Sequence, residues 1–357
     1  MHETAAHPGP EADRPLGATQ GATTLDELDL ALVNALQLAP RAPWSQLAGP
    51  LGVDAATLSR RWSRLRDSGA AWVTCYSAAG QVVFGSLAFV EVNCAPQARE
   101  RLAARLAGHP HAVSVELVAG SCDLLLTVAA ASTRMMSEYV LSLARDPDIT
   151  GTRTHLVQRL HQEGSQWRLD ALSREQQRGL EHDTTGSADR IVTPDERALM
   201  LALAEDGRRP VATLAALLGR PESTVRRLLA GVLGGGKAVL RCEAAHLHAG
   251  WRTTATLWMA APPTELEAAA EELTQLRDTR LSASVASEAN LVGVVWMHGM
   301  DDLSRYEARV GAKFPALRVL NRAVTLRWIK RMGRLLDGEG RSVGCVPMDV
   351  WQPVSAT

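Results

Sequence analysis

The first pattern along the chain is that of short helices. Its apolar residues recur at intervals of three and four positions, the spacing of one helix face; they are Leu25, Leu28, Leu32 and Leu36, then Leu47 and Ala48, then Leu58, Trp62 and Leu65. The pattern predicts a compact unit of three helices.

A different pattern follows, in which short apolar runs alternate with amphipathic stretches. The runs predict strands over 86–93, 112–118, 123–130 and 152–161, and the amphipathic stretches predict helices over 97–107 and 133–144. This order, βαββαβ, is that of a ferredoxin-like domain.

The strand predicted over 86–93 is apolar on both faces. Leu87 and Phe89 lie on one face, and Ala88, Val90 and Val92 lie on the other. Because helices of such a domain cover only one face of its sheet, we expect a second sheet on the other face. That sheet comes from the other half of the chain or from another chain.

The same sequence features return at a constant offset of 167 residues. The matching pairs are Leu47 and Leu214, Gly52 and Gly219, Thr57 and Thr224, Gly69 and Gly236, Cys75 and Cys242, and Val118 and Val285. The constant offset predicts a duplicated unit of about 140–150 residues.

The repeat divides the chain into seven expected segments. They are a disordered tail (1–24), a first helical unit (25–76) and α+β domain (77–163), a linker (164–190), a second helical unit (191–243) and α+β domain (244–331), and a C-terminal tail (332–357). The first tail has no basic start followed by an apolar run, so we do not interpret it as a signal peptide. Because a linker raises the effective concentration of the two sheets, we favour an internal pseudo-dimer, with further association of chains.

Composition narrows the class of protein. Hydrophobic residues make up 46% and charged residues 22% of the chain, as in soluble globular proteins, and no apolar run is long enough for a membrane span. The five cysteines are scattered, which favours a reducing, cytoplasmic location and neither a zinc site nor a disulfide framework. The net charge of −1 gives no overall basic bias, so any contact with nucleic acid has to depend on local charge.

The third predicted helix has two distinct faces. Asp54 is suited to cap it, and Leu58, Trp62 and Leu65 form its buried stripe. Small side chains for close approach, and arginines for guanine edges or phosphates, suit a helix in the major groove of DNA. The alternative is a solvated basic face. The candidate DNA-binding residues are Ala56, Thr57, Ser59, Arg60, Ser63 and Arg64, with Arg226 and Arg227 in the second copy.

Several motifs, in order, resemble the Lrp/AsnC family of feast/famine regulators. They are Leu25-Asp26-Glu27-Leu28-Asp29, the segment from Arg41 to Leu47-Ala48, the segment from Gly52 to Leu65, the residues after Gly69, and the turn from Val118 to Leu126. The resemblance covers 25–163 well and 192–331 more loosely. It implies two tandem copies of a winged helix-turn-helix, each followed by a ferredoxin-like RAM domain.

The resemblance also implies a transcription regulator without a cofactor, whose RAM domains pair through their sheets and bind an effector, often an amino acid. The implied effector site is the turn Gly120, Ser121, Cys122 and Asp123. Gly120 permits a tight turn, and Asp123 could meet an ammonium group. The alternative for Asp123 is a carboxylate satisfied by amides of the turn.

The second copy departs from these motifs. Its turn reads Ser287-Glu288-Ala289-Asn290, and Gly231 stands where the first copy has Arg64. Arg227 keeps the place of Arg60, so we expect a weaker reader of DNA. In the first copy, Pro50 removes a backbone donor, and we expect the second helix to end early or bend there.

An enzyme is the rival interpretation. Fused Lrp-like pairs also occur as sirohaem decarboxylases, which carry dense His- and Arg-rich segments. The comparable strands here contain His155, His161, Arg322 and Arg327 but lack such a dense segment. His109-Pro110-His111 has no acidic or cysteine partner nearby, so we expect no metal there.

Overall fold

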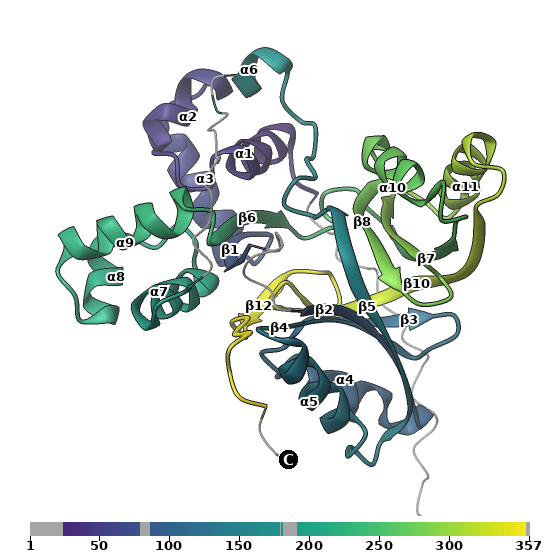
Figure 1. The fold of residues 1–357 in the computed structure, drawn as a ribbon. Helices are drawn as coiled ribbons and strands as arrows, with labels where there is room; N and C mark the ends of the chain where they lie inside the picture. The colour runs from purple at the N-terminus through teal and green to yellow at the C-terminus, as the bar shows by residue number, and fades with distance from the viewer. Residues whose placement is uncertain (1–23, 79–85, 179, 181–190, 355–357) are drawn as a thin grey trace, which may run out of the picture.

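The structure, a computed structural model, describes residues 24–78, 86–178, 180 and 191–354. Nearly all of the predicted N-terminal tail lies outside these residues. Figure 1 shows the helical units together on one side and the two α+β domains against each other on the other.

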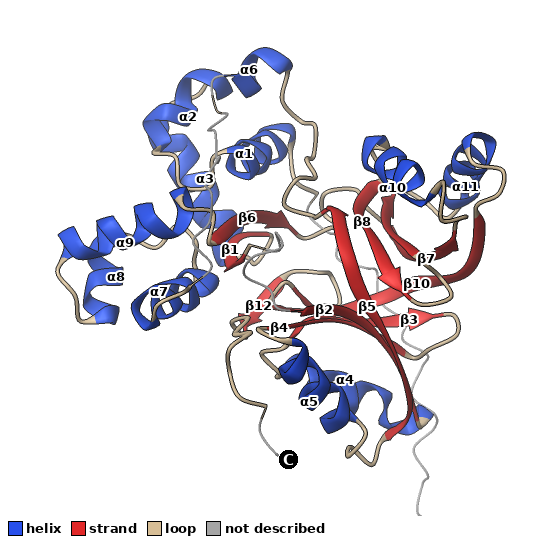
Figure 2. Ribbon diagram, in the orientation of Figure 1, coloured by secondary structure: helices blue, strands red, loops and turns tan. Residues whose placement is uncertain are grey.

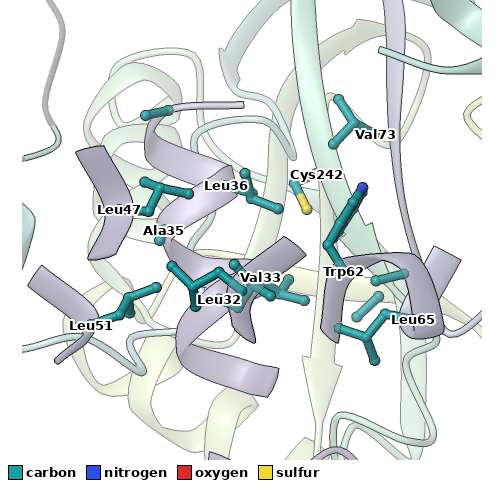
Figure 3. Packing of buried hydrophobic residues seen from close by; sticks show 14 of the residues in the cluster. Leu32, Val33, Ala35, Leu36, Leu47, Leu51, Trp62, Leu65, Val73 and Cys242 are labelled. Atoms are coloured by element: carbon teal, nitrogen blue, oxygen red, sulfur yellow. The ribbon is translucent and has the colours of Figure 1, made fainter. Parts of the chain in front are cut away.

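The first helical unit consists of α1 (Glu27–Leu38), α2 (Trp44–Leu51) and α3 (Ala55–Asp67). Asp54 caps α3 as predicted, since its carboxylate accepts from the amide of Thr57 at 2.8 Å. Leucines of all three helices pack with Trp62, and Cys242 from the second half of the chain reaches into the same core (Figure 3).

Pro50 does not shorten α2. The helix continues to Leu51 and ends at Gly52, whose φ of 67° allows the left-handed turn. The equivalent helix of the second unit ends at Leu218, the matching position, without a proline. The expected early end was therefore wrong, because the final turn of the helix can form around the missing donor; the alternative of a bend at Pro50 stays a prediction.

The second unit repeats this order with α7 (Pro194–Glu205), α8 (Val211–Leu218) and α9 (Glu222–Gly234). A capping box of Thr193 and Glu196 starts α7, whereas no side chain caps α9, which follows Pro221. The core of this unit takes in Cys75 from the first half. The matching cysteines Cys75 and Cys242 thus each lie in the core of the opposite unit.

The strands that follow the helices form no wing within their own unit. β1 (Ala71–Ser77) pairs antiparallel with β6 (Ala238–Ala244), from Ala71 opposite Ala244 to Ser77 opposite Ala238. Every residue of β1 is buried. For the described residues, the predicted wing is therefore corrected to a ribbon between the two halves.

Both α+β domains have the predicted βαββαβ order. The first contains β2 (Ser86–Cys94), α4 (Arg99–Ala107), β3 (Ala112–Ala119), β4 (Leu124–Ala130), α5 (Thr133–Leu143) and β5 (Ile149–Gln162), with a short 3-10 turn, Pro96–Ala98, before α4. The second contains β7 (Thr253–Ala260), α10 (Leu266–Gln275), β8 (Thr279–Ala286), β9 (Leu291–Met297), α11 (Asp301–Lys313) and β10 (Arg318–Arg331).

The two sheets share their long last strands. Residues 149–156 of β5 pair with β2, and residues 156–162 pair with β8 of the other domain. In the same way, residues 318–324 of β10 pair with β7, and residues 324–330 pair with β3. The strands thus close into the ring β3-β4-β2-β5-β8-β9-β7-β10.

This arrangement covers both faces of each sheet within one chain. Ala88, Val90 and Val92 face helices α4 and α5, whereas Phe89 faces the other sheet, edge-on to Trp258 at 5.9 Å between ring centres. Figure 2 shows the strands between the two outer pairs of helices. The second sheet expected from the apolar pattern is the one in the other half of the chain.

The segments after β5 and β10 pack onto the helical units. Trp167, Leu172 and Leu180 are buried, and α6 (Arg174–Arg178) lies near α2. After β10, β11 (Arg334–Leu336) and β12 (Ser342–Cys345) extend the sheet, and Asp349 forms an ion pair with Arg197 of α7. In their described parts, the predicted linker and C-terminal tail are integral to the fold. No helix of the described ranges could cross a membrane.

Two matching arginines join the halves reciprocally. Arg41 donates to the carbonyls of Gly207 at 2.6 Å and Arg209 at 3.0 Å. Arg208, which is 167 residues further on, donates to the carbonyls of Pro40 at 2.6 Å and Ala42 at 2.9 Å. We call these four bonds the arginine clasp; with the ribbon, it fixes one helical unit relative to the other.

Removing half of the arginine clasp should destabilise the protein. Because Arg41→Ala leaves two carbonyls without a charged donor, we expect it to lower the free energy of unfolding by about 2–4 kcal/mol. The exposed Arg66→Ala should change it by no more than about 0.5 kcal/mol. Denaturant titration of both variants is the measurement, and equal midpoints would show that the clasp contributes nothing.

A buried carboxyl group lies at another contact between the halves, where β3 of the first α+β domain pairs with β10 of the second. Glu116 of β3 is 3% exposed and accepts a hydrogen bond from Thr325 of β10 at 2.5 Å. Burial raises the pKa of Glu116 to about 7, against the opposing effects of Thr325 and Arg331. The folded protein therefore binds this proton more tightly than the unfolded chain does.

This proton should make stability depend on pH. Because the folded pKa exceeds the unfolded value of 4.5, the contribution is complete below pH 4.5 and is lost as the pH rises to about 7. Over that window, the unfolding free energy of the wild type should fall by about 3 kcal/mol relative to Glu116→Gln. If the unfolding free energies of the two proteins changed with pH in the same way between pH 4.5 and 8, this would contradict the assignment.

Candidate nucleic-acid interface and sensing turn

The helix α3 presents its predicted face to solvent. Leu58, Trp62 and Leu65 are at most 4% exposed and hold the opposite face in the core. Ala56, Arg60 and Arg64 are exposed, and Thr57, Ser59 and Ser63 are partly exposed. The six predicted residues are therefore accessible together on one helix.

Arg60 is the unpaired cation of this face. Its guanidinium donates to the hydroxyl of Thr57 at 3.1 Å, and no described carboxylate lies within ion-pair distance. The Thr57 hydroxyl in turn donates to the capping residue Asp54 at 2.6 Å. Arg60 is thus directed along the start of the helix without a direct ion pair, although the carboxylate of Asp54 lies just beyond the Thr57 hydroxyl.

Arg64 has a partner that the sequence analysis did not foresee. One of its nitrogens lies 2.6 Å from both carboxylate oxygens of Asp29, whose side chain is 5% exposed. Arg61 contacts the same carboxylate at 2.8 Å and Asp26 at 2.5 Å, and these bonds raise the pKa of Arg61. The pairs pin α3 to α1. The signal was present in the opening Asp26 and Asp29, one helical turn apart.

The helix α9 of the second unit lacks this fixation. Leu228 and Gly231 stand in the places of Arg61 and Arg64, and Glu196, in the place of Asp29, binds Lys237 at 2.9 Å instead of α9. Arg226 is paired with Glu222 at 2.7 Å. Arg227 is exposed and has no ion-pair partner in the described part of the chain. The unpaired arginine is thus present in both copies, but only the first is held on a pinned helix.

The predicted effector residues lie at the seam between the two domains. A side chain at Gly120, whose φ is 140°, would come within 2.7 Å of the carbonyl oxygen of Arg322. The Ser121 hydroxyl accepts from Asn321 at 2.5 Å, and Cys122 is buried between the sheets. Only Gly therefore fits where this turn approaches β10.

Asp123 is satisfied by the protein itself. One of its carboxylate oxygens accepts from the amide of Cys94 at 2.9 Å, and the other pairs with Arg99. In the second copy, Asn290 accepts from the amide of Ala261, also at 2.9 Å, and Ala261 matches Cys94. The two side chains hold the same backbone position in both copies.

The loss of the acid in the second turn is accompanied by the loss of its partner. Leu266 stands where the first copy has Arg99, so a neutral Asn290 leaves no cation unpaired. Asn290 also donates to the carbonyl of Ala261 at 2.9 Å, which an aspartate could not do. The position of Asp123 is therefore charged in the first turn, and the matching position, Asn290, is neutral in the second.

The histidines of the rival interpretation make internal contacts. Nδ1 of His155 forms a hydrogen bond with Oγ of Ser287 at 2.9 Å. The ring of His155 packs against Trp258, with 4.2 Å between the ring centres. His161 contacts Ser284 Oγ at 2.6 Å. Within the described ranges, no group of three or more His, Cys, Asp or Glu residues is placed to hold a metal.

Comparison with known families gives two matches, both in the first half of the chain. Residues 25–66 match the AsnC-type helix-turn-helix domain, and residues 87–167 match the Lrp/AsnC ligand binding domain. The matches coincide with α1 to α3 and with β2 to β5. They cover both sites described above.

Individual relatives agree with these matches. The HTH-type transcriptional regulator AldR of Mycolicibacterium smegmatis is 31% identical over 142 residues, which make up 38% of this chain and 82% of AldR. The HTH-type transcriptional regulator FL11 of Pyrococcus horikoshii is 25% identical over 140 residues, 39% of this chain and 93% of FL11.

One solved structure is similar to nearly the whole chain. The siroheme decarboxylase NirDL aligns with 86% of this chain and 93% of its own, with a TM-score of 0.57 and 13% identity, a likeness of fold alone. The sequence matches decide the family. The chain belongs to the Lrp/AsnC family.

Proposed function

We propose that the protein is a sequence-specific regulator of transcription that binds double-stranded DNA through α3. The observation that carries the proposal is Arg60, an exposed arginine without a carboxylate partner, beside small side chains on a capped and pinned helix. Such a helix can enter the major groove and donate to base edges. The names of AldR and FL11 support the same class of function.

Arg64 has a double role in this proposal. Its ion pair with Asp29 uses one nitrogen, and its side chain is still 58% exposed. The remaining donors can contact a phosphate while the pair keeps α3 in place. Arg64 is thus assigned to positioning and backbone contact, and Arg60 to base recognition.

The halves are proposed to be duplicated copies that bind unequal half-sites. The ribbon of β1 and β6 and the arginine clasp hold the two helical units at one spacing. Because α9 lacks a side-chain cap and the bonds that pin α3, we expect a strong half-site for α3 and a degenerate one for α9.

The effector is a further part of the proposal. A small molecule with an ammonium group, such as an amino acid, would bind at the turn Gly120–Asp123 by replacing Arg99 on the carboxylate of Asp123. The second turn has the neutral Asn290 at the position of Asp123, so it offers no such exchange there. A response would require the effector to bind one conformation of the chain better than another. We also expect further association of chains, which sedimentation would detect.

The siroheme decarboxylase neighbour keeps an enzyme as the alternative. We favour a non-enzyme because the relatives with sequence similarity are named as regulators, whereas NirDL shares 13% identity. A tetrapyrrole-binding enzyme would show a Soret band after incubation with an iron tetrapyrrole, and a regulator would not.

The DNA-binding proposal predicts unequal effects of two matching substitutions. On the preferred operator, Arg60→Ala should lose about 1–3 kcal/mol of binding free energy, because base-edge donors are removed. Arg227→Ala should lose less. Arg134→Ala, at an exposed arginine of α5 far from α3, is the matched control. Band shifts at fixed salt are the measurement.

Two outcomes would overturn this assignment. Normal binding by Arg60→Ala would show that α3 is not the reader. Footprints with two equally protected, symmetric half-sites, each equally sensitive to its own helix, would show that the second copy reads DNA as well as the first.

The two turns predict a separation of stability from response. Asp123→Ala and Asn290→Ala each remove the acceptor of a backbone amide, so each should lower the free energy of unfolding by about 1–3 kcal/mol. To find an effector, L-amino acids are tested for an effect on the affinity for DNA. The effect of such an effector should be lost in Asp123→Ala and kept in Asn290→Ala. If the effect survived Asp123→Ala but was lost with Asn290→Ala, the effector would bind at the turn of the second half, which would contradict the proposal.

A further inference from the structure

A buried cluster of tryptophans and arginines lies where the ribbon meets the second α+β domain. Its tryptophans come from distant parts of the chain and are at most 7% exposed; they are Trp72, Trp167, Trp251, Trp296 and Trp328. Arg280 lies 3.8 Å from the ring centre of Trp296, and Arg331 lies 5.0 Å from it. We call this group the Trp–Arg cluster.

The Trp–Arg cluster carries an excess of positive charge. Arg241, Arg280 and Arg331 share the single carboxylate of Glu243, and all four residues are at most 8% exposed. Although burial alone would raise it, the three cations hold the pKa of Glu243 at about 2. Glu243 therefore balances one of the three positive charges, and the carboxyl groups of Glu163 and Glu116 also act on Arg241 and Arg331.

Several buried donors of the cluster have no hydrogen-bond partner among the described residues. They are Nε and Nη1 of Arg331 and the indole nitrogens of Trp72, Trp251 and Trp296. Indole faces offset part of a buried guanidinium charge, but they accept no conventional hydrogen bond. Buried donors without acceptors call for an explanation, such as a bound ligand.

A cavity of about 60 Å³ adjoins the cluster. Its lining includes His246 and Trp328, which contact the tryptophans and arginines above, and Thr254, whose hydroxyl accepts from Trp328 at 3.3 Å. Arg252 and Arg327 also line it; both are exposed, and neither has an ion-pair partner in the described part of the chain.

Two other titratable groups, His246 and Asp337, line the cavity. Burial, with Arg331 and Arg280, lowers the pKa of His246 to about 3, so its ring is neutral. Asp337 also lines the cavity, but one of its oxygens accepts from the amides of Glu339 at 2.9 Å and Arg341 at 2.8 Å. Asp337 is thus held by its own turn, and its single negative charge is outnumbered by those of Arg252 and Arg327.

The first half has nothing equivalent at the matching positions. Tyr76, Val113 and Ala129 stand there in place of Glu243, Arg280 and Trp296. They are packed with Met348 and Val350 of the C-terminal segment in an apolar core. The cationic cluster is therefore not required by the fold, which is stable with an apolar cluster at the related place.

We propose that the cavity between Arg252, Arg327 and the Trp–Arg cluster binds the carboxylate of a small organic anion. The volume of the cavity suits a carboxylate group. The two unpaired arginines can form ion pairs with it, and the buried cations behind His246 and Trp328 favour its negative charge. This site is separate from the turn Gly120–Asp123. It lies beside β1 through Trp72, next to the ribbon that joins the helical units.

Tryptophan fluorescence of the full chain, without DNA, tests the site. The probes are acetate and benzoate, with acetamide and benzamide as uncharged analogues of the same shape, at constant ionic strength. We expect a saturable change with at least one carboxylate and none with the amides. An equal response to the amides, or no response to either carboxylate, would overturn the proposal.

Variants at the rim assign the response to this cavity. Arg252→Gln and Arg327→Gln are exposed changes that leave the buried arginines in place, and each should weaken carboxylate binding about tenfold, the cost of one lost charge contact. Arg134→Gln on α5 should bind like the wild type. Rim variants with unchanged affinity would place the anion elsewhere. Since no DNA is present, this result is independent of the proposed DNA binding.

Discussion

The exchange of β5 and β10 is the constraint on which the rest of the fold depends. Each strand serves its own sheet with its first half and the opposite sheet with its second half. The two apolar faces are covered only because both strands cross, and neither domain could bury Phe89 or Trp258 alone. The ribbon and the arginine clasp repeat this reciprocity at the helical units. The two halves therefore fold as one body, although each has a complete set of elements.

Local patterns explain which parts of the fold the sequence could predict. Asp54 lies three residues from the amide that it caps, and Leu58, Trp62 and Leu65 lie on one face of a single helix, so spacing alone identified them. The strands of the α+β domains carried a similarly local signal. Arg41 and Gly207 are 166 residues apart, and no periodicity connects them. The residues of the Trp–Arg cluster come from six segments of the chain, and no local pattern predicted that they meet.

The candidate sites show the same division. The accessible face of α3 followed from helix geometry, but the pair of Arg64 with Asp29 depends on how α1 crosses α3. At the candidate effector turn, the sequence showed only that Asn290 replaces Asp123 and that the second copy departs from the motif. The structure shows that both side chains hold the same backbone amide and that the partner changed with them, from Arg99 to Leu266. The replacement of Asp123 by Asn290 can therefore be interpreted only together with the replacement of its spatial neighbour, Arg99, by Leu266.

Because both helical units belong to one chain, they determine how the protein would lie on a chromosome. Two identical subunits related by a dyad can be rotated by half a turn and present the same surface. Here the unit with Arg64 cannot be exchanged for the unit with Gly231, because β1 and β6 hold each in its place. A bound molecule would therefore have a polarity along the double helix, with a defined upstream and downstream side. Its C-terminal segment, where Asp349 pairs with Arg197 of α7, would always lie on the same side.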